Sequence, residues 1–194
     1  MFWPFNHFKK SRLTPAGTIE AIYGMIVTQA REPIFYRDLG VPDTVNGRFD
    51  LLLLHLWLLL RRLRTVQGAP GGATELSQAL FDRFCEDMDD NLREIGIGDL
   101  SVPKHMKRVG EAFYGRAQAY GNALAEEGDA ALIEAVARNV YGGNGDNAAS
   151  RLAAYIRRIA AGLDRQAVTA IVAGALSFPD PALDAPSKGP TTDA

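Results

Sequence analysis

The chain has almost no cysteine: Cys85 is the only one in 194 residues, and a single thiol cannot form an internal disulfide. A reducing compartment is consistent with this composition. An excess of charge of one sign is also missing, because the formal net charge is -2 and the pI is near 5.9. Such a balance gives no overall attraction to nucleic acid or to an anionic membrane. Any basic surface must therefore be local, and we expect no DNA partner.

Long apolar runs are missing too. The longest, residues 51–60, would extend about 15 Å as a helix against a hydrocarbon core of about 30 Å. It therefore predicts a buried helix of the core and not a membrane span. The first residues lack the basic segment, the apolar stretch and the cleavage site of a secretory signal. From this we expect a cytoplasmic protein.

Sequence motifs of catalysis and metal binding are also missing. The chain has no Cys-x-x-Cys, no phosphate-binding Gly-x-x-x-x-Gly-Lys, no Gly-x-Ser-x-Gly and no His-Glu-x-x-His. Its three histidines, His7, His55 and His105, lie far apart in the sequence. The glycine-rich residues 142–145 have no predicted strand before them and predict a loop. We therefore predict no catalytic residue, no metal site and no cofactor.

Helical periodicity is abundant, and strand alternation appears nowhere. The pattern predicts an all-α, single-domain helical bundle of about seven helices, with Thr14, Thr74 and Asp129 as caps. The expected helices cover residues 15–32, 47–64, 74–95, 101–125, 129–141, 147–162 and 165–175, with one short helical turn between 32 and 46. The domain should span residues 14–176. Residues 177–194 have too little apolar content to fold and predict a disordered tail.

An aromatic and basic arm occupies residues 1–13. Its residue types are those found at membrane interfaces: Phe2, Trp3, Phe5, Phe8, Lys9, Lys10 and Arg12. Two interpretations stay open for this arm, a contact with a membrane surface and a segment folded onto the domain.

A polar stripe interrupts the apolar helix of residues 47–64. Arg48, His55 and Arg62 are seven residues apart and therefore fall on one side of it. The stripe could be a binding line. The favoured alternative is that His55 is a hydrogen-bonded core histidine and that Arg48 pairs with Asp43 or Asp50.

Charge is distributed unevenly over two successive helices. Residues 74–95 carry seven carboxylates against Arg83 and Arg93, whereas the next helix opens with Lys104, Lys107 and Arg108. Cations at a helix N-terminus oppose the helix dipole. Either the acidic helix lies beside this basic turn and compensates it, which we favour, or the turn meets an anionic surface such as lipid headgroups or RNA phosphate.

Five ordered motifs together resemble the ubiquinol-cytochrome c chaperone family. They are residues 31–36 (REPIFY), 40–44 (GVPDT), 47–50 (GRFD) followed by His55, 88–99 (MDDNLREIGIGD) and 113–120 (FYGRAQAY). Their order and spacing match over about residues 15–125, and the length and the N-terminus resemble bacterial members. The resemblance implies a helical, non-catalytic protein that assists assembly of the cytochrome bc1 complex. The implied partner is unassembled cytochrome b or another bc1 subunit, bound on the cytoplasmic face of the inner membrane. Ribosome contact belongs to mitochondrial members and is left open.

The resemblance nominates twelve residues for partner binding or for the fold: Arg31, Tyr36, Asp43, Thr44, Arg48, His55, Arg93, Glu94, Asp99, Tyr114, Arg116 and Tyr120. We expect a binding surface around Tyr36, Asp43, Arg48 and His55, onto which Arg93, Asp99, Arg116 and Tyr120 converge. Two other classes of function stay open. One is a helical module that binds haem or quinone between apolar helices. The other is a helical enzyme with an unrecognised cleft.

Overall fold

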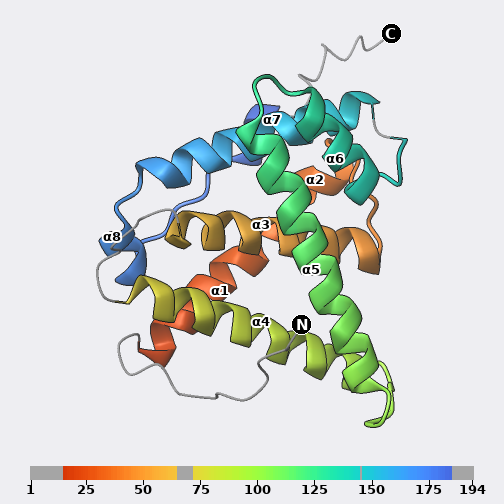
Figure 1. Ribbon diagram of the computed structural model, residues 1–194, viewed down its shortest axis with the longest axis vertical. Helices are drawn as coiled ribbons and strands as arrows, with labels where there is room; N and C mark the ends of the chain where they lie inside the picture. Colours follow the sequence, from red (N-terminus) through yellow and green to blue (C-terminus); the bar gives the residue numbers. More distant parts are fainter. Residues whose placement is uncertain (1–14, 65–71, 145, 185–194) are drawn as a thin grey trace, which may run out of the picture.

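The computed structural model describes residues 15–64, 72–144 and 146–184. These residues form α-helices and one 3-10 helix, so the all-α prediction is confirmed (Figure 1). The elements are α1 (Ala16–Ala30), α2 (Pro33–Arg37), α3 (Val45–Arg64), α4 (Ala73–Glu94), α5 (Val102–Ala125), α6 (Ala130–Val140), α7 (Asp146–Arg165), α8 (Val168–Val172) and the 3-10 helix η1 (Pro181–Asp184). The short turn expected between residues 32 and 46 is α2.

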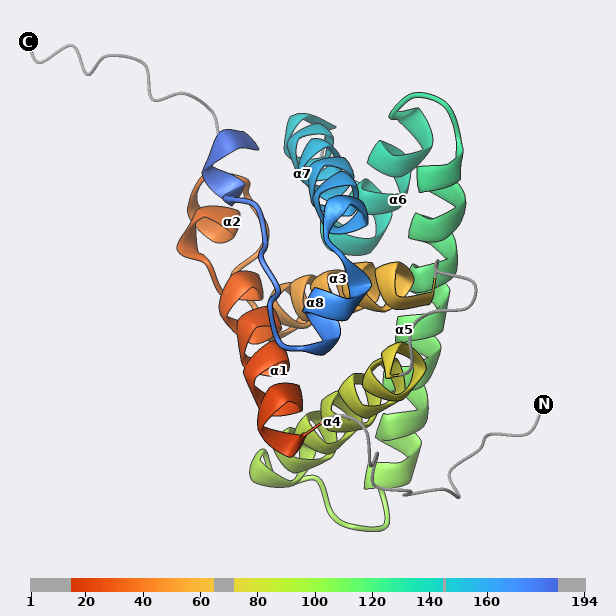
Figure 2. The same ribbon diagram turned by 90° about the vertical axis from the view of Figure 1, so that its left-hand side faces the viewer.

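Helix α3 is the centre of the bundle. It packs against α1, α4, α5, α6 and α7, and Figure 2 shows it between α7 on one side and α4 on the other. Within the run of residues 51–60 only Leu52 is partly exposed. A helix that is apolar on all sides is stable only where every side is covered. The prediction of a buried core helix is therefore confirmed.

A tight turn leads into α3. The Thr44 hydroxyl accepts a hydrogen bond from the Gly47 backbone N–H at 3.1 Å, which caps the new helix. The chain passes so close to itself here that a Cβ on Gly47 would lie 2.0 Å from the carbonyl oxygen of Pro42. Only glycine fits at this position without moving the turn, so residues 42–47 set the direction in which α3 enters the core.

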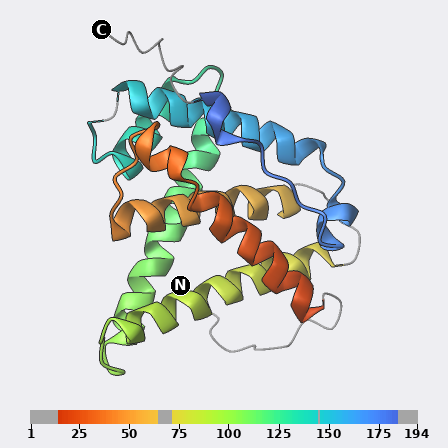
Figure 3. The same cartoon turned by 180° about the vertical axis from the view of Figure 1, so that it is seen from behind.

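The segment after α8 lies on the domain surface. Figure 3 shows it crossing from α8 towards α2 in front of α7. The Gln166 side chain donates to the Ser177 carbonyl at 2.8 Å and accepts from the Ser177 N–H at 3.1 Å. Phe178 contacts the His55 ring edge-on, and Pro181 is buried. The sequence placed a disordered tail from residue 177, whereas these apolar anchors hold residues 177–184; residues 185–194 lie outside the described part.

Helix starts differ from the predicted caps in detail. Helix α4 begins at Ala73 with Gly72 at the cap position, and the Glu75 carboxylate accepts the Gly72 N–H at 3.1 Å. The prediction of Thr74 as cap is therefore wrong by two residues. Asp129 does occupy the cap position of α6, but its carboxylate pairs with Arg157. Thr14 and the arm of residues 1–13 lie outside the described residues.

No helix within the described ranges is both long enough and apolar enough to cross a membrane.

We expect Gly47→Ala to lower the free energy of unfolding by about 1–3 kcal/mol, the usual cost of overpacking, because its Cβ would collide with the Pro42 carbonyl. Gly24→Ala is the matched control: it lies within α1 with nothing within 4 Å of the added Cβ, so it should stabilise the protein by up to about 1 kcal/mol. Urea denaturation measures both. Equal stability of the two variants would contradict the role given to Gly47.

Candidate functional site

An exposed polar cluster lies where α2 ends and α3 begins. Arg48 Nε donates to Asp43 Oδ1 at 2.7 Å, which confirms the predicted pairing. The Arg48 guanidinium also lies 5.6 Å from the centre of the Tyr36 ring, within cation–π range. The Tyr36 hydroxyl in turn donates to the Ala30 carbonyl at 2.7 Å. These contacts hold three chemically distinct groups in fixed positions at the surface, and we call Tyr36, Asp43 and Arg48 the α2–α3 cluster.

Electrostatics and exposure suit the α2–α3 cluster for contact with a partner. The side chains of Arg48 and Asp43 are both 55% exposed, and the Arg48 guanidinium holds the pKa of Asp43 below its ordinary value. Val45, at the start of α3, is 84% exposed. Arginine, tyrosine and an exposed aliphatic side chain together are typical of protein interfaces.

Arg31 and Thr44 flank the cluster and have different roles. Arg31 is exposed and occupies the C-cap position of α1. Thr44 caps α3, as described above, so its hydroxyl is already used by the fold.

His55 is a core residue and does not lie on the surface. It is 0% exposed, its Nδ1 is 2.7 Å from the Leu51 carbonyl oxygen, and its Nε2 is 2.9 Å from the Tyr155 hydroxyl. Because a carbonyl only accepts, Nδ1 carries the proton and Nε2 accepts from Tyr155. The Gln29 amide donates to the same hydroxyl at 2.8 Å. Burial lowers the pKa of His55 to about 4, so the ring is neutral at physiological pH.

The stripe of Arg48, His55 and Arg62 is therefore not a binding line. Arg48 is exposed, and Arg62 donates to the Gln166 carbonyl at 2.8 Å. His55 is buried against the rings of Phe35, Tyr155 and Phe178. The expected place of His55 on a partner-binding surface is wrong, and the alternative of a hydrogen-bonded core histidine is confirmed.

A second buried polar contact joins α3 to α5. Asp50, 5% exposed, pairs with Arg116, whose guanidinium nitrogen lies 2.6 Å from the carboxylate. Burial outweighs the attraction of Arg116 and raises the pKa of Asp50 to about 6. One turn further along α5, Tyr120 is 0% exposed and packs on Trp57 at 5.5 Å between ring centres. Arg116 and Tyr120 thus hold the fold together and do not extend the α2–α3 cluster.

The Asp50–Arg116 pair was missed by sequence reasoning. Each residue belongs to a motif that was matched, one at the start of α3 and the other in the middle of α5. Nothing local in either motif indicates its partner. Tyr114, in the same motif as Arg116, points outward and is 51% exposed, with its ring against Phe113.

The remaining nominated residues, Arg93, Glu94 and Asp99, lie at the turn between α4 and α5. Arg93 pairs with Asp89 at 2.6 Å and with Asp99 across the turn, and Glu94 is exposed. Figure 3 shows this turn at the lower end of the molecule, away from α2. The expected convergence of Arg93 and Asp99 on the α2–α3 cluster is therefore wrong.

The basic first turns of α5 belong to a helix that lies beside the acidic helix α4, as the favoured interpretation expects. Helix α4 does pack against α5. Within residues 72–144, however, no salt bridge joins α4 to Lys104, Lys107 or Arg108, and Lys107 has only a 3.6 Å contact with Glu111 on its own helix. The favoured compensation by α4 does not occur as ion pairs.

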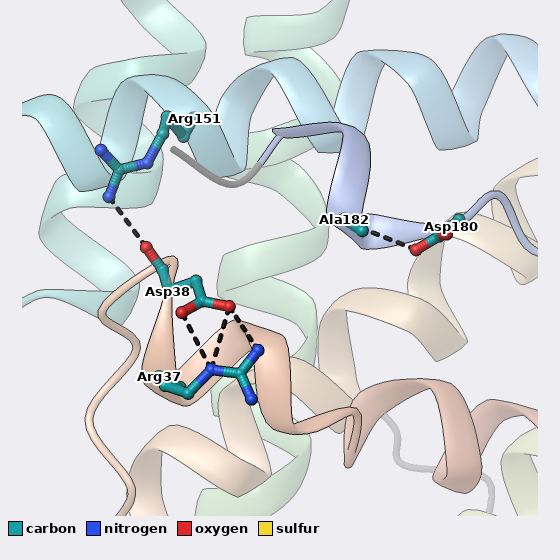
Figure 4. A network of polar contacts seen from close by, with 5 residues as sticks. All are labelled: Arg37, Asp38, Arg151, Asp180 and Ala182. Atoms are coloured by element: carbon teal, nitrogen blue, oxygen red, sulfur yellow. Dashed lines mark hydrogen bonds and ion pairs between the residues drawn. The ribbon is translucent and has the colours of Figure 1, made fainter. Parts of the chain in front are cut away.

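A cavity of about 450 Å³ lies between the end of α1, α2 and η1. It is lined by Gln29, Glu32, Pro33, Ile34, Arg37, Asp180 and Pro181. Figure 4 shows the polar contacts around it: Arg37 binds Asp38 through two nitrogens, and Arg151 donates to the Asp38 carbonyl at 3.1 Å. Asp180 accepts the Ala182 N–H at 2.8 Å. The lining mixes charged and amide side chains with Pro33, Ile34 and Pro181, and it does not lie between the long apolar helices where a haem or quinone pocket was expected.

Metal-ligating side chains do not gather in the described residues: no group of three or more His, Cys, Asp and Glu is placed to hold an ion there.

Comparisons with known proteins give a consistent family. The model of the ubiquinol-cytochrome C chaperone family matches residues 37–178. The chain is 31% identical over 112 residues to the mitochondrial protein CBP3 of Saccharomyces cerevisiae, which covers 56% of this chain and 32% of that protein. It is 26% identical over 152 residues to ubiquinol-cytochrome c reductase complex assembly factor 1 of Drosophila melanogaster, covering 76% of this chain and 58% of the fly protein. It therefore spans 32% of the yeast protein and 58% of the fly protein, less than two thirds of either.

A solved structure shares the fold. The crystal structure of the Cbp3 homolog from Brucella abortus superposes on this chain with a TM-score of 0.78 and 36% sequence identity. The superposition covers 86% of this chain and 91% of that one.

The two buried polar residues of α3 give opposite dependences of stability on pH. The folded pKa of Asp50, about 6, lies above its ordinary 3.8. Its contribution to the free energy of unfolding is therefore present at low pH and is lost as the pH rises through 6. The folded pKa of His55, about 4, lies below its ordinary 6.5, so its contribution is present above 6.5 and is lost as the pH falls through 4.

Asp50→Asn should remove the pH dependence of stability that comes from Asp50 and leave the one that comes from His55. We expect the free energy of unfolding of this variant to fall more steeply than that of the original protein between pH 6.5 and pH 4, as measured by urea titration at each pH. Asp164→Asn, in an exposed pair with Arg61, is the control and should follow the original curve. Parallel curves for all three proteins would refute the assignment.

Proposed function

The chain belongs to the ubiquinol-cytochrome c chaperone family, and on this premise we propose that it is a non-catalytic assembly chaperone of the cytochrome bc1 complex. Its client would be unassembled cytochrome b, held at the membrane surface until partner subunits join. The observation that carries the proposal is the family match, which runs from the end of α2 to Phe178 and so includes most of the described helices.

The names of the relatives support the same process. The fly protein is named as an assembly factor of the ubiquinol-cytochrome c reductase complex, and a Xenopus laevis protein of the same name is 26% identical over 106 residues. The family model itself is described as a chaperone. A binding role, without chemistry of its own, fits a chain in which the buried His55 and Asp50 are both used by the fold.

We assign client contact to the α2–α3 cluster. Three of the twelve nominated residues, Tyr36, Asp43 and Arg48, lie together, with an exposed ion pair and a half-buried ring held in place by the contacts described above. A loop of the client could bind the Arg48 guanidinium or the Asp43 carboxylate by replacing one partner of an exposed ion pair, which costs little because water and salt screen such pairs. The exposed Val45 beside them offers an apolar contact.

Release of the client would follow from competition. The sequence carries no nucleotide-binding motif, so ATP hydrolysis is not available as a driving step. A later subunit that binds the same loops more tightly would displace the chaperone by mass action. The proposed site of action is the cytoplasmic face of the inner membrane.

The two other classes of function gain no support from the geometry. Haem needs an axial ligand such as an imidazole nitrogen, and the histidine inside the apolar core, His55, has both nitrogens engaged by Leu51 and Tyr155. A hydrolase needs acid, base and nucleophile around a cleft, whereas the cavity beside α2 holds Glu32, Arg37 and Asp180, of which Arg37 is already paired with Asp38.

Deletion of the gene should strongly reduce the mature bc1 complex and its haem-b absorption, measured on isolated membranes. The double variant Tyr36→Ala, Arg48→Ala, expressed in place of the original protein, should reproduce at least half of that loss. Its matched control is Arg138→Ala, which breaks an exposed ion pair with Glu134 on α6 and should leave the complex at its normal level.

A deletion strain with a normal amount of bc1 complex would refute the assembly role. A normal amount in the double variant alone, with the deletion strain deficient, would refute only the assignment of the α2–α3 cluster. Circular dichroism and thermal melting of the purified variants establish that each one is folded.

A further inference from the structure

The chain after α8 crosses the domain in an extended conformation. Residues 175–180 belong to no helix, and Figure 3 shows them passing in front of α7 towards η1. Exposure alternates along them, because Ala175 and Ser177 are exposed whereas Leu176 and Phe178 are partly buried. This period of two is that of an extended peptide that lies with one side on a surface. We call residues 175–180 the C-terminal strap.

Side chains of the domain hold the main chain of the C-terminal strap. In the described part of the chain, no hydrogen bond between main-chain groups joins residues 176–179 to another segment. Gln166 instead binds both the N–H and the carbonyl of Ser177, as described above. Two more side chains donate to strap carbonyls: Gln29 to Pro179 at 3.3 Å and Arg158 to Asp180 at 2.8 Å. A peptide of another sequence carries the same carbonyl groups, so these contacts do not depend on the side chains of the strap.

One side chain of the C-terminal strap anchors it on an aromatic site. Phe178 packs edge-on against His55, with 5.7 Å between the ring centres. Phe35 and Tyr155 pack against the same histidine from the domain. The proline that follows Phe178 favours an extended backbone at the phenylalanine. Bound carbonyls and an anchoring ring are the two features by which protein grooves hold extended peptides.

The groove below the C-terminal strap is built from contacts in which the strap takes no part. The Tyr155 hydroxyl donates to His55 and accepts from the Gln29 amide. This bond fixes one N–H of the amide and leaves the other directed at the strap. The Arg158 guanidinium lies 5.6 Å from the centre of the Tyr155 ring. The donors and the aromatic site would therefore keep their places without the strap.

Release of the C-terminal strap should need far less free energy than unfolding of the domain. The hydrogen bonds from Gln166 and Arg158 are exposed, and water can replace them. Segments that open locally are those with few buried side chains and with exposed hydrogen bonds. The strap has both properties, whereas the helices below it do not.

The groove has unfilled space at its η1 end. The cavity of about 450 Å³ described above begins at Gln29 and Asp180 and extends to Ile34 and Arg37 of α2. Residues larger than those of the strap therefore fit after the proline. Helix α2 also carries Tyr36 of the α2–α3 cluster, so the groove ends on the helix that contributes to the proposed client surface.

We propose that this groove binds an extended segment of a partner protein that contains an aromatic residue followed by proline. The C-terminal strap occupies the groove until such a segment displaces it. The aromatic ring of the partner takes the place of Phe178 on His55, and Gln29, Gln166 and Arg158 bind the partner's carbonyls. Use of the groove by the client rests on the proposed function, whereas binding of a peptide to the isolated protein does not.

A labelled peptide with the sequence of residues 173–184 tests the proposal, and fluorescence anisotropy measures its dissociation constant with the full-length protein. The attached strap competes at an effective concentration of about 1 mM, so the original protein should bind the peptide weakly. Phe178→Ala removes the anchor of the strap and should bind the peptide at least tenfold more tightly. Ser177→Ala changes the adjacent exposed side chain and should bind like the original protein.

Two altered peptides show which features the groove recognises. A peptide with alanine in place of its phenylalanine should bind at least tenfold more weakly, because it lacks the ring. A peptide that keeps only the Phe-Pro pair, with alanine or serine elsewhere, should bind within about tenfold of the original peptide, because its carbonyls remain. Binding of the strap sequence with no binding of this second peptide would assign the groove to this chain alone and overturn the proposal.

A groove variant tests the main-chain contacts. In the Phe178→Ala protein, Gln166→Ala should weaken peptide binding by about fivefold or more, because two hydrogen bonds are lost. Gln78→Ala is the matched control: this exposed glutamine of α4 contacts Asp82 and should leave binding unchanged. Equal peptide affinity of the two variants would contradict the role given to Gln166.

Hydrogen exchange shows whether Phe178→Ala acts locally: the strap should exchange faster while α3 and α7 stay protected. If the variant is unfolded, the original protein serves, with a peptide whose phenylalanine is replaced by photoreactive benzoylphenylalanine. This peptide should crosslink to the groove residues of α1, α3 and α7. A folded Phe178→Ala protein that binds the peptide no better than Ser177→Ala would overturn the proposal, as would crosslinks outside the groove. A deletion strain with normal bc1 complex would instead refute the assembly role and leave peptide binding intact.

Discussion

The fold depends on covering α3 on every side while two polar side chains within it still find partners. His55 finds Tyr155 on α7, and Asp50 finds Arg116 on α5. The two positions are five residues apart and so point about 140° away from each other around the helix axis. Leucine side chains pack in many ways and tolerate small rotations of a helix, whereas an unpaired buried carboxylate or imidazole is costly. These two contacts therefore favour one rotation of α3 within its shell of helices.

This constraint explains why so many residues of the family motifs lie inside the molecule. Thr44 and Gly47 set the entrance of α3, and Asp50, Arg116 and Tyr120 occupy the interface between α3 and α5. Most of these motif residues therefore hold the central helix α3 in its place. Removing these residues by mutation would unfold the protein or shift its helices, so a loss of function there says nothing about the client surface.

Local patterns in the sequence were sufficient to predict most of the helices of the fold. Helix periodicity and the glycine and proline positions place the helices within a few residues, because those signals act between neighbours along the chain. The boundary of the tail could not be placed in this way, since residues 177–184 are held by Gln166 and by the ring of His55. The pairing of Asp50 with Arg116 likewise requires knowing that α5 crosses α3. The Arg48–Asp43 pair was predictable because the two residues are only five positions apart in the sequence.

The same geometry links the turn after α4 to the α2–α3 cluster. Helix α5 starts at this turn, and Arg116 ties it to Asp50 near the beginning of α3, beside the α2–α3 cluster. Fourteen residues separate Val102 from Arg116, which is about 21 Å along a helix. The Asp50–Arg116 pair therefore fixes the direction of α3 relative to α5, and with it the position of Tyr36, Asp43 and Arg48.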